Sequence, residues 1–172
     1  MEIIVRGFRE EDIPAMTRIW NEVVEDGIAF PQEESLTEET GAAFFTGQSH
    51  CGVAAEVSSG EIMGLYILHP NNVGRCGHIC NTSYAVVSAS RGNGIGGKLV
   101  RDSLDKARSL GFRIMQFNAV VASNTYARRL YEGLGFVQLG VIPKGFRMKD
   151  GTYQDICPYY IELWGDLWKS GK

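Results

Sequence analysis

The sequence predicts one domain of the α/β (α+β) class, with a central mixed, mostly antiparallel sheet of six to seven strands and about four helices. A β-branched run, a glycine-rich segment, an amphipathic stretch and a second β-branched run follow one another over residues 79–121, which is the order of a parallel strand–helix–strand unit. Strand-like runs on both sides of this unit predict antiparallel pairs. The 172 residues are 44% hydrophobic, enough to fill one core, so residues 1–172 are expected to form a single domain.

The N-terminal part predicts a strand and two helices. Residues 3–8 are rich in β-branched side chains and form a strand, and residues 10–24 form a helix because their apolar positions recur at three and four residues. Residues 27–34 form a loop, after which Thr37 caps a short helix that runs through Phe45. The apolar positions of the first helix are Ile13, Met16, Ile19, Trp20 and Val23.

Next along the chain, a hairpin is predicted. Residues 52–57 and 62–68 form its two strands, which turn at residues 58–60, where Gly60 favours a tight turn. Residues 69–76 connect this hairpin to the strand–helix–strand unit.

The strand–helix–strand unit consists of a strand at 79–87, a helix at 95–110 and a strand at 113–121. Its parallel strands require the usual right-handed crossover. Gly111 provides the helix with a good C-terminal stop.

The C-terminal part predicts a last helix and an antiparallel pair. Residues 125–134 form the helix, and strands 136–147 and 153–163 pair around a turn at 149–151.

A glycine-rich segment lies between strand 79–87 and helix 95–110, and it raises the functional question. Glycines let the backbone approach an anion closely, while the unpaired N–H groups and the dipole of a helix start attract it. We therefore expect a phosphate-binding loop, the alternative being a loop that only turns the chain. The segment consists of Arg91, Gly92, Asn93, Gly94, Ile95, Gly96, Gly97 and Lys98.

Three known patterns overlap on this segment. The nucleoside-triphosphate loop needs Ser or Thr after the lysine to hold Mg²⁺, but Leu99 follows Lys98 here. The dinucleotide fingerprint needs an acidic residue about 20 positions downstream, but residues 112–129 contain no Asp or Glu. The third pattern, Arg-x-x-Gly-x-Gly, cradles the pyrophosphate of coenzyme A and needs neither partner. Only this third pattern fits the chain.

A second motif lies downstream, at residues 124–136, and reads Asn-Thr-Tyr-Ala-Arg-Arg-Leu-Tyr-Glu-Gly-Leu-Gly-Phe. With the Arg-x-x-Gly-x-Gly loop it resembles the GNAT superfamily of acyl-CoA-dependent N-acetyltransferases, over roughly residues 2–163. The resemblance implies the GNAT fold with a parallel strand pair at the cofactor site, acetyl-CoA as cosubstrate, and no metal. It implies cofactor contacts from the eight loop residues and from Ala85, Val86, Val87, Asn124 and Tyr131.

Tyr131 is the expected catalytic residue, acting as the group that protonates the leaving thiolate. It follows Asn124 by seven residues, or two helical turns, so both side chains share one face. A tyrosine pKa of about 10 keeps the hydroxyl protonated at neutral pH, and a thiol titrates near 8.5. The alternatives are a core aromatic for Tyr131 and a helix cap for Asn124.

The general base is not assigned by the sequence. An amine nucleophile must lose a proton, yet the strand position where many GNAT enzymes carry a Glu lies in an uncharged run, residues 81–84. The candidates are Glu33, Glu34, His78 and Asp155.

Two finer resemblances concern the acceptor. Residues 21–33 and 149–155 are similar to phosphinothricin-type N-acetyltransferases, which acetylate small amino acids and their analogues. Residues 77–81 are similar to yeast acetyltransferases of proline analogues, in which a strand Asn holds the substrate. A substrate carboxylate could pair with Arg147 or Arg75. The expected acceptor-binding residues are Phe30, Glu33, Asn81, Tyr84, Tyr153 and Asp155.

Composition narrows the partners. A formal net charge of −3 with scattered basic residues gives no stripe for nucleic acid, and no segment is long and apolar enough to span a membrane. The N-terminus lacks the features of a secretory signal, so a cytoplasmic location with reduced cysteines is expected. Cys76, His78 and Cys80 are too few for a structural zinc site, so no metal is expected.

The sequence therefore predicts an enzyme that transfers acetyl from acetyl-CoA to a small, amino-acid-like amine by direct attack. Dimers are common in the GNAT superfamily, so a homodimer is compatible with this prediction. The alternative is a non-catalytic acyl-CoA-binding or sensor module, which would keep the loop but need neither Tyr131 nor an acceptor cleft.

Overall fold

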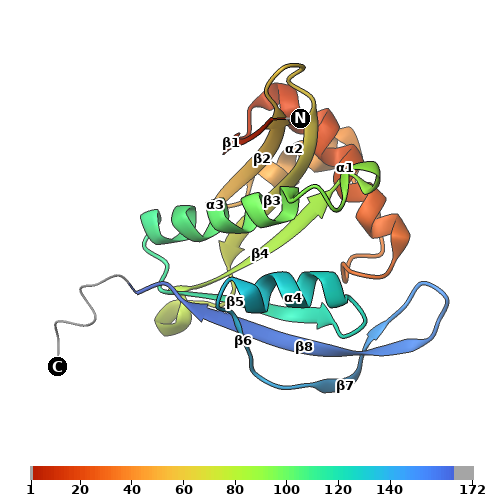
Figure 1. Cartoon of the computed structure of the whole chain (residues 1–172), viewed down its shortest axis with the longest axis vertical. Helices are drawn as coiled ribbons and strands as arrows, with labels where there is room; N and C mark the ends of the chain where they lie inside the picture. Colours follow the sequence, from red (N-terminus) through yellow and green to blue (C-terminus); the bar gives the residue numbers. More distant parts are fainter. Residues whose placement is uncertain (1, 165–172) are drawn as a thin grey trace.

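The strands of the sheet lie in the order β1-β2-β3-β4-β5-β8-β6, and β7 also pairs with β8 (Figure 1). A computed structural model describes residues 2–164. Strands β4 and β5 are parallel, and the other paired strands are antiparallel, which confirms the predicted fold class. The strands are β1 (Ile3–Gly7), β2 (His50–Glu56), β3 (Ile62–Pro70), β4 (Ile79–Val86), β5 (Ile114–Val121), β6 (Val137–Gln138), β7 (Ile142–Arg147) and β8 (Tyr153–Glu162). The α-helices in the described residues are α1 (Ile13–Asp26), α2 (Glu38–Thr46), α3 (Ile95–Ser109) and α4 (Thr125–Gly133).

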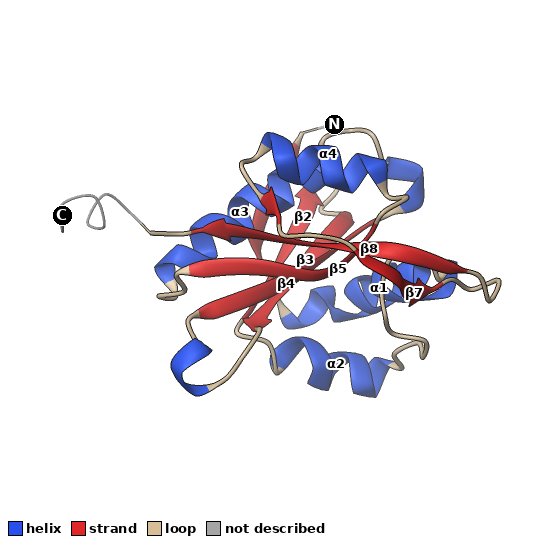
Figure 2. Ribbon diagram, turned by 90° about the horizontal axis from the view of Figure 1, so that it is seen from below, coloured by secondary structure: helices blue, strands red, loops and turns tan. Residues whose placement is uncertain are grey.

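Each face of the sheet has its own hydrophobic core. Helices α1 and α2 cover one face, and α3 and α4 cover the other (Figure 2). Strand β3 is buried along most of its length because its successive side chains enter the two cores alternately. Leu65 and Ile67 join the core on the α1 side, while Tyr66 and Leu68 join the core on the α3 side.

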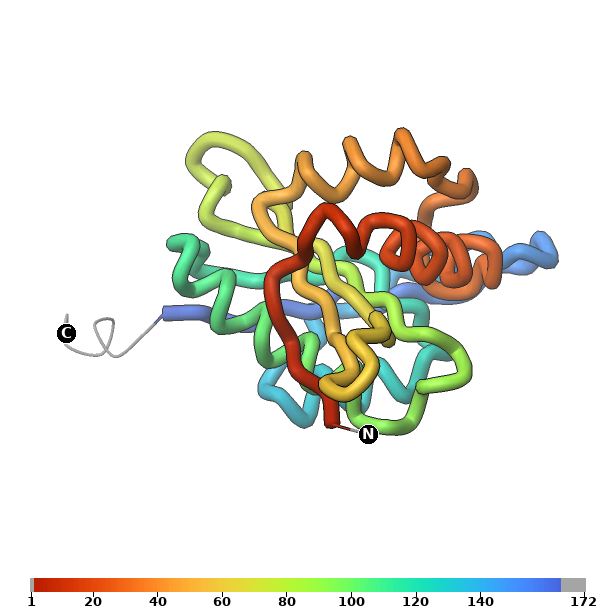
Figure 3. The backbone as a smooth tube through the Cα atoms, turned by 90° about the horizontal axis from the view of Figure 1, so that it is seen from above, coloured from red at the N-terminus to blue at the C-terminus, as the bar shows by residue number. Residues whose placement is uncertain are grey.

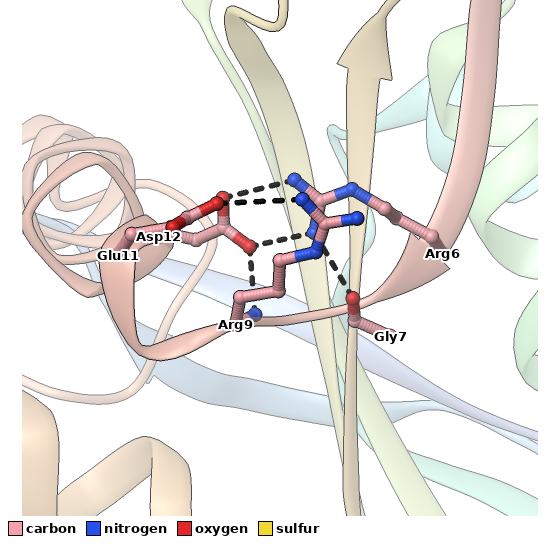
Figure 4. A network of polar contacts seen from close by, with 5 residues as sticks. All are labelled: Arg6, Gly7, Arg9, Glu11 and Asp12. Carbon is pink, nitrogen blue, oxygen red and sulfur yellow. Dashed lines mark hydrogen bonds and ion pairs between the residues drawn. The ribbon is translucent and has the colours of Figure 1, made fainter.

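The start of α1 is fixed to β1 by a buried ion pair. A short 3₁₀ turn, Glu10–Asp12, precedes α1, so the helix begins later than the sequence predicts. Both Asp12 carboxylate oxygens accept hydrogen bonds from Arg6, at 2.7 and 3.0 Å, and one also accepts from the Arg9 N–H at 2.7 Å (Figure 4). Burial alone would raise the pKa of Asp12, but these bonds outweigh it and lower the pKa.

The segment predicted as one strand at 136–147 is two strands, which brings the sheet to eight. Both β6 and β7 pair with β8, but the ladder is interrupted between them. The Leu139 N–H donates to the Pro158 carbonyl at 2.8 Å, and Pro158 has no N–H to return on that side. Farther along, Lys144 takes a φ of 55°, and its N–H donates to Asp155 Oδ1 at 2.9 Å, within an irregular stretch of β7.

Strands β4 and β5 pair only where they begin. The register joins Ile79 to Ile114 and Cys80 to Met115, after which the two strands diverge (Figure 1). On its other edge β4 pairs with β3 throughout. The divergence opens a gap in the middle of the sheet, and the candidate site lies there.

Candidate active site

The glycine-rich segment forms a loop that opens helix α3, as the sequence predicts. Gly92 and Gly94 take positive φ values of 84° and 75°, which glycine adopts without strain. Gly94 is the N-cap, and no side chain caps the helix there. The Lys98 N–H donates to the Gly94 carbonyl at 3.2 Å, so the amides of residues 95–97 precede the first helical bond. These free amides and the helix dipole suit an anion.

A pocket of about 550 Å³ lies beside this helix start, a volume typical of a small-molecule site. Its walls come from β4, the start of α3, helix α4, the end of α1 and the tip of the β7–β8 hairpin. The lining residues are Val23, Asp26, Ile28, Ala29, Tyr84, Val86, Ser90, Arg91, Gly92, Ile95, Gly96, Val100, Ser123, Asn124, Tyr126, Ala127, Leu130, Tyr131 and Met148.

Two backbone amides of β4 face the gap between β4 and β5. The Val87 N–H donates to the Met63 carbonyl at 3.0 Å, so Val87 and every second residue before it bond to β3. The residues between them, Tyr84 and Val86, therefore direct their N–H groups towards β5, beyond the point where the recorded β4–β5 pairing ends. Of the three strand residues predicted to bind the cofactor, only Val86 has its backbone on the pocket side; Ala85 and Val87 bond to β3.

Tyr131 lies in the pocket among aromatic rings. Its ring centroid is 4.5 Å from that of Phe117, 5.6 Å from Phe136 and 6.3 Å from Tyr84. Within residues 2–164 its hydroxyl makes no hydrogen bond to another protein group, so it is available to a ligand. Burial raises the pKa of Tyr131, which keeps the hydroxyl protonated.

Asn124 is both a helix cap and a pocket residue. As the N-cap of α4, its side chain accepts a hydrogen bond from the Ala127 N–H at 3.2 Å. Its side chain also belongs to the pocket lining. The cap is shown, and the cofactor contact stays a prediction.

Arg91 and Lys98, the two cations of the loop, differ in their contacts. Arg91 Nη2 lies 3.4 Å from Asp26 Oδ2, and Arg91 Nε lies 3.4 Å from the Val86 carbonyl oxygen. An exposed pair at this distance is weak, so the guanidinium is able to turn towards an anion. Lys98 Nζ instead donates to the Ile3 carbonyl at 2.9 Å and ties α3 to β1.

Half of the eight loop residues line the pocket, and half do not. Four of them line the pocket: Arg91, Gly92, Ile95 and Gly96. The other four lie outside its lining: Asn93, Gly94, Gly97 and Lys98. Asn93 bonds within the loop, from Nδ2 to the Ser90 carbonyl at 3.2 Å. Cofactor contact by any of the eight stays a prediction.

Five of the six expected acceptor residues lie outside the pocket lining: Phe30, Glu33, Asn81, Tyr153 and Asp155. Phe30 is buried in the core, with its ring centroid 4.4 Å from that of Trp20. Tyr153 is 57% exposed near the tip of the β7–β8 hairpin. Asp155 Oδ1 accepts the Lys144 N–H, so it supports the backbone of β7.

The remaining expected acceptor residues, Asn81, Tyr84 and Glu33, do not lie together in the structure. Asn81 and Tyr84 are an odd number of positions apart on β4, so they point to opposite faces of the sheet. Tyr84 lines the pocket, whereas Asn81 Nδ2 donates to Asn71 Oδ1 at 3.2 Å. Glu33 forms a short ion pair with Arg147. Within the described chain, none of the four base candidates lines the pocket: Glu33, Glu34, His78 and Asp155.

One wall of the pocket, formed by the end of α1 and the hairpin tip, contains side chains that were not predicted from the sequence. Val23, Asp26 and Met148 belong to this wall. The end of α1 lies beside the β7–β8 hairpin (Figure 3). Two bonds join them: the Lys149 N–H donates to the Gly27 carbonyl at 3.1 Å, and Lys149 Nζ donates to the Glu25 carbonyl at 2.7 Å. Two signals pointed to these segments: Gly27, which takes a φ of 64° at the C-cap of α1, and the resemblance over residues 21–33 and 149–155.

Metal and membrane features can be stated for residues 2–164 only. Over that range, no three His, Cys, Asp or Glu side chains lie close enough together to hold a metal ion. No helix in the same range has the length and apolarity to cross a membrane.

Comparison with known proteins fixes the family. The family model for acetyltransferases of the GNAT family matches residues 14–136. This chain belongs to the GNAT family. It is 30% identical over 156 residues to N-acetyltransferase aca1 of Schizosaccharomyces pombe, covering 82% of this chain and 75% of that protein. With this match, the chain is an acyl-CoA-dependent N-acetyltransferase.

Other matches of this GNAT acetyltransferase agree with the fold. A GCN5-related N-acetyltransferase from Kribbella flavida superposes with a TM-score of 0.86 at 31% identity, over 93% of this chain and 97% of that one. YwnH of Bacillus subtilis, provisionally named a phosphinothricin acetyltransferase, is 27% identical over 150 residues, covering 84% of this chain and 90% of that protein. YncA from Salmonella typhimurium, solved with its cofactor acetyl-CoA, has a TM-score of 0.88 at 22% identity, over 96% of each chain. The predicted resemblance to phosphinothricin-type enzymes is confirmed at this level.

Proposed function

We propose that this acetyltransferase transfers the acetyl group of acetyl-CoA to the amine of a small, amino-acid-like acceptor. The observation that carries the proposal is the continuity of one pocket: it joins a helix start with free amides to a gap where Tyr131 and the β4 amides meet. That arrangement matches the two ends of a coenzyme A thioester, the diphosphate and the acyl group. The acetyl-CoA held by YncA supports the same ligand here.

The chain's own groups have separate roles in the proposed reaction. Bound acetyl-CoA supplies an activated acyl group. The amides at the start of α3 and the Arg91 guanidinium bind its diphosphate. The N–H groups of Tyr84 and Val86 lie too far apart along the strand to reach one atom, so one of them donates to the carbonyl oxygen, where negative charge develops during attack. The Tyr131 hydroxyl donates to the sulfur as the thiolate leaves.

The acceptor class follows from the wall formed by the end of α1 and the hairpin tip. Val23, Asp26 and Met148 of this wall line the same pocket as α3 and α4, and its volume of about 550 Å³ is that of a small-molecule site. The likeness to YwnH supports an amino acid or an analogue as that molecule. Of the expected acceptor residues, Tyr84 lines this pocket, and its contact with the acceptor belongs to this proposal.

Location and assembly are also proposed. The cysteines within residues 2–164 are free thiols, and three of them are buried, which supports a reducing compartment such as the cytoplasm. A net charge of −3 supports small molecules over nucleic acid as partners. Exposed apolar side chains along β6 and β7 support a homodimer through that edge: Val137, Leu139, Val141 and Ile142.

An amine screen that measures free thiol tests the proposal. The protein is incubated with acetyl-CoA and with small amino acids and their analogues, peptides, or polyamines, and thiol release is compared with a control without amine. We expect release above the control for amino-acid-type amines. Release only with peptides or polyamines would contradict the acceptor class. Binding of acetyl-CoA without release for any amine would favour the sensor module.

A further inference from the structure

Helix α4 carries Arg128 between two of its pocket residues, the N-cap Asn124 and Tyr131. Asn124, Arg128 and Tyr131 follow one another at spacings of four and three residues, which places them on one face of the helix. Asn124 and Tyr131 line the pocket, whereas Arg128 does not. Because the three residues share one short helix, a shift of the helix at Arg128 would also move Asn124 and Tyr131.

Arg128 makes three hydrogen bonds to three different parts of the chain. Its Nε donates to the Tyr159 hydroxyl at 3.1 Å, its Nη1 to the Ala122 carbonyl at 3.1 Å, and its Nη2 to Gln138 Oε1 at 3.2 Å. Tyr159 also donates to Glu132 Oε1 at 2.8 Å, which returns the network to α4. We call these five residues the Arg128 clamp. It joins α4 to the end of β5, to β6 and to β8.

The chemistry of the clamp favours one geometry. A guanidinium is planar and presents its donors in a fixed fork, so three acceptors in different directions fix its orientation. Tyr159 is 0% exposed, and burial raises its pKa, so its hydroxyl stays neutral and able to donate. A half-buried guanidinium is costly without partners, so a rotation of α4 that broke these bonds would be opposed.

Helix α4 needs such a support. It is nine residues long, below the length at which a helix is stable alone, and none of its residues is fully buried. Leu130 and Tyr131 pack against the core as partly buried side chains, and the clamp adds directional bonds that fix the orientation of the helix.

We propose that Arg128 is a positioning residue for acetyl transfer, which holds α4 so that the Tyr131 hydroxyl stands at the reacting end of the pocket. The inference rests on the proposed function. The phosphate-binding loop is carried by α3, and none of the clamp residues belongs to that loop. Loss of the clamp should therefore slow turnover while cofactor binding is largely kept.

The test compares Arg128→Met with Arg129→Met. Arg129 is the adjacent, exposed arginine on the same helix and is outside the clamp, so both variants lose one charge from α4. We expect Arg128→Met to lower kcat about ten-fold or more, with the acetyl-CoA Kd changed by less than about three-fold, and Arg129→Met to change neither. Arg128→Lys, which keeps the charge without the fork, should recover only part of kcat.

A double-mutant cycle separates positioning from general damage. In a Tyr131→Phe background, Arg128→Met should cause little additional loss of kcat, because the hydroxyl it positions is already gone. If Arg128→Met does not fold, Tyr159→Phe keeps the buried ring, removes the shared hydroxyl and should show the same non-additivity.

Three outcomes would overturn the inference: equal kcat for the Arg128 and Arg129 variants, full additivity with Tyr131→Phe, or a loss confined to the acetyl-CoA Kd. Failure of the proposed function is recognised separately, because the unmodified enzyme would then release no thiol with any amine.

Discussion

At the scale of single residues, the account depends most on Tyr131. Its hydroxyl is unbonded to the described protein and lies in the pocket, and burial raises its pKa. A group of this kind stays protonated across the physiological range and can donate to a developing thiolate. Its ring, by contrast, contributes packing with Phe117 and Phe136 that does not need the hydroxyl.

Tyr131→Phe separates these two contributions. We expect kcat to fall about ten-fold or more, because proton donation is lost while the ring still packs. The Kd for acetyl-CoA, measured by calorimetry, should stay within about two-fold. Tyr160→Phe removes the hydroxyl of a tyrosine on β8 that does not line the pocket and should change kcat less than about three-fold. An unchanged kcat for Tyr131→Phe would remove its catalytic role.

The sequence predicted which residues reach the pocket where a local motif fixes their direction. It did not predict this where tertiary contacts decide the direction. Tyr131 and Arg91 reach the pocket because a helix period and a strand–loop–helix turn fix their direction. Phe30 and Asp155 belong to the segments 21–33 and 149–155 that carry the acceptor resemblance. In the structure Phe30 packs on Trp20, and Asp155 accepts a hydrogen bond from the Lys144 N–H. A sequence pattern cannot reveal which partner an aromatic ring or carboxylate finds in the fold.

At the scale of elements, the start of α3 is the decisive feature. The loop turns through two left-handed glycines, and this geometry leaves the first helical amides free. A Cβ at Gly94 would meet open space, so its requirement is conformational rather than steric. A substitution at Gly94 is therefore expected to destabilise the loop through backbone strain and not through a steric clash.

Gly94→Ala measures that strain. We expect the free energy of unfolding, from urea denaturation, to fall by about 1–2 kcal/mol, because a residue with a Cβ disfavours the left-handed region. Gly133→Ala is the matched control: it also faces open space, but within helix α4, and should be neutral or stabilising by up to about 1 kcal/mol. Equal destabilisation by both substitutions would contradict the strained-loop account.

The elements themselves were largely predictable, with one informative failure. Thr37 caps α2 and Gly111 follows α3, as local capping rules require. The single strand predicted over 136–147 is divided because the partner strand contains Pro158, which lacks the N–H that a continuous ladder needs. That signal was present in the sequence, but it becomes meaningful only when the two strands are known to pair.

At the scale of the whole molecule, the pocket is assembled from distant parts of the chain. The end of α1 lies beside the β7–β8 hairpin (Figure 3). Lys149 of the hairpin bonds to the carbonyls of Glu25 and Gly27. Helices α3 and α4 provide the opposite side. The resemblance over residues 21–33 and 149–155 pointed to these two segments, but no periodicity fixes which of their side chains meet, so the sequence could predict the cofactor end of the site but not the side chains of the wall that faces it.

The central claim is that the start of α3 binds the diphosphate of an acyl-CoA, and calorimetric titration tests it most directly. The folded protein is titrated with acetyl-CoA and, separately, with S-acetylpantetheine, which has the thioester but lacks the diphosphate. We expect acetyl-CoA to bind and S-acetylpantetheine to bind at least about ten-fold more weakly, since the charge-assisted bonds are lost. Equal affinities for the two ligands, or no heat with either, would contradict the account.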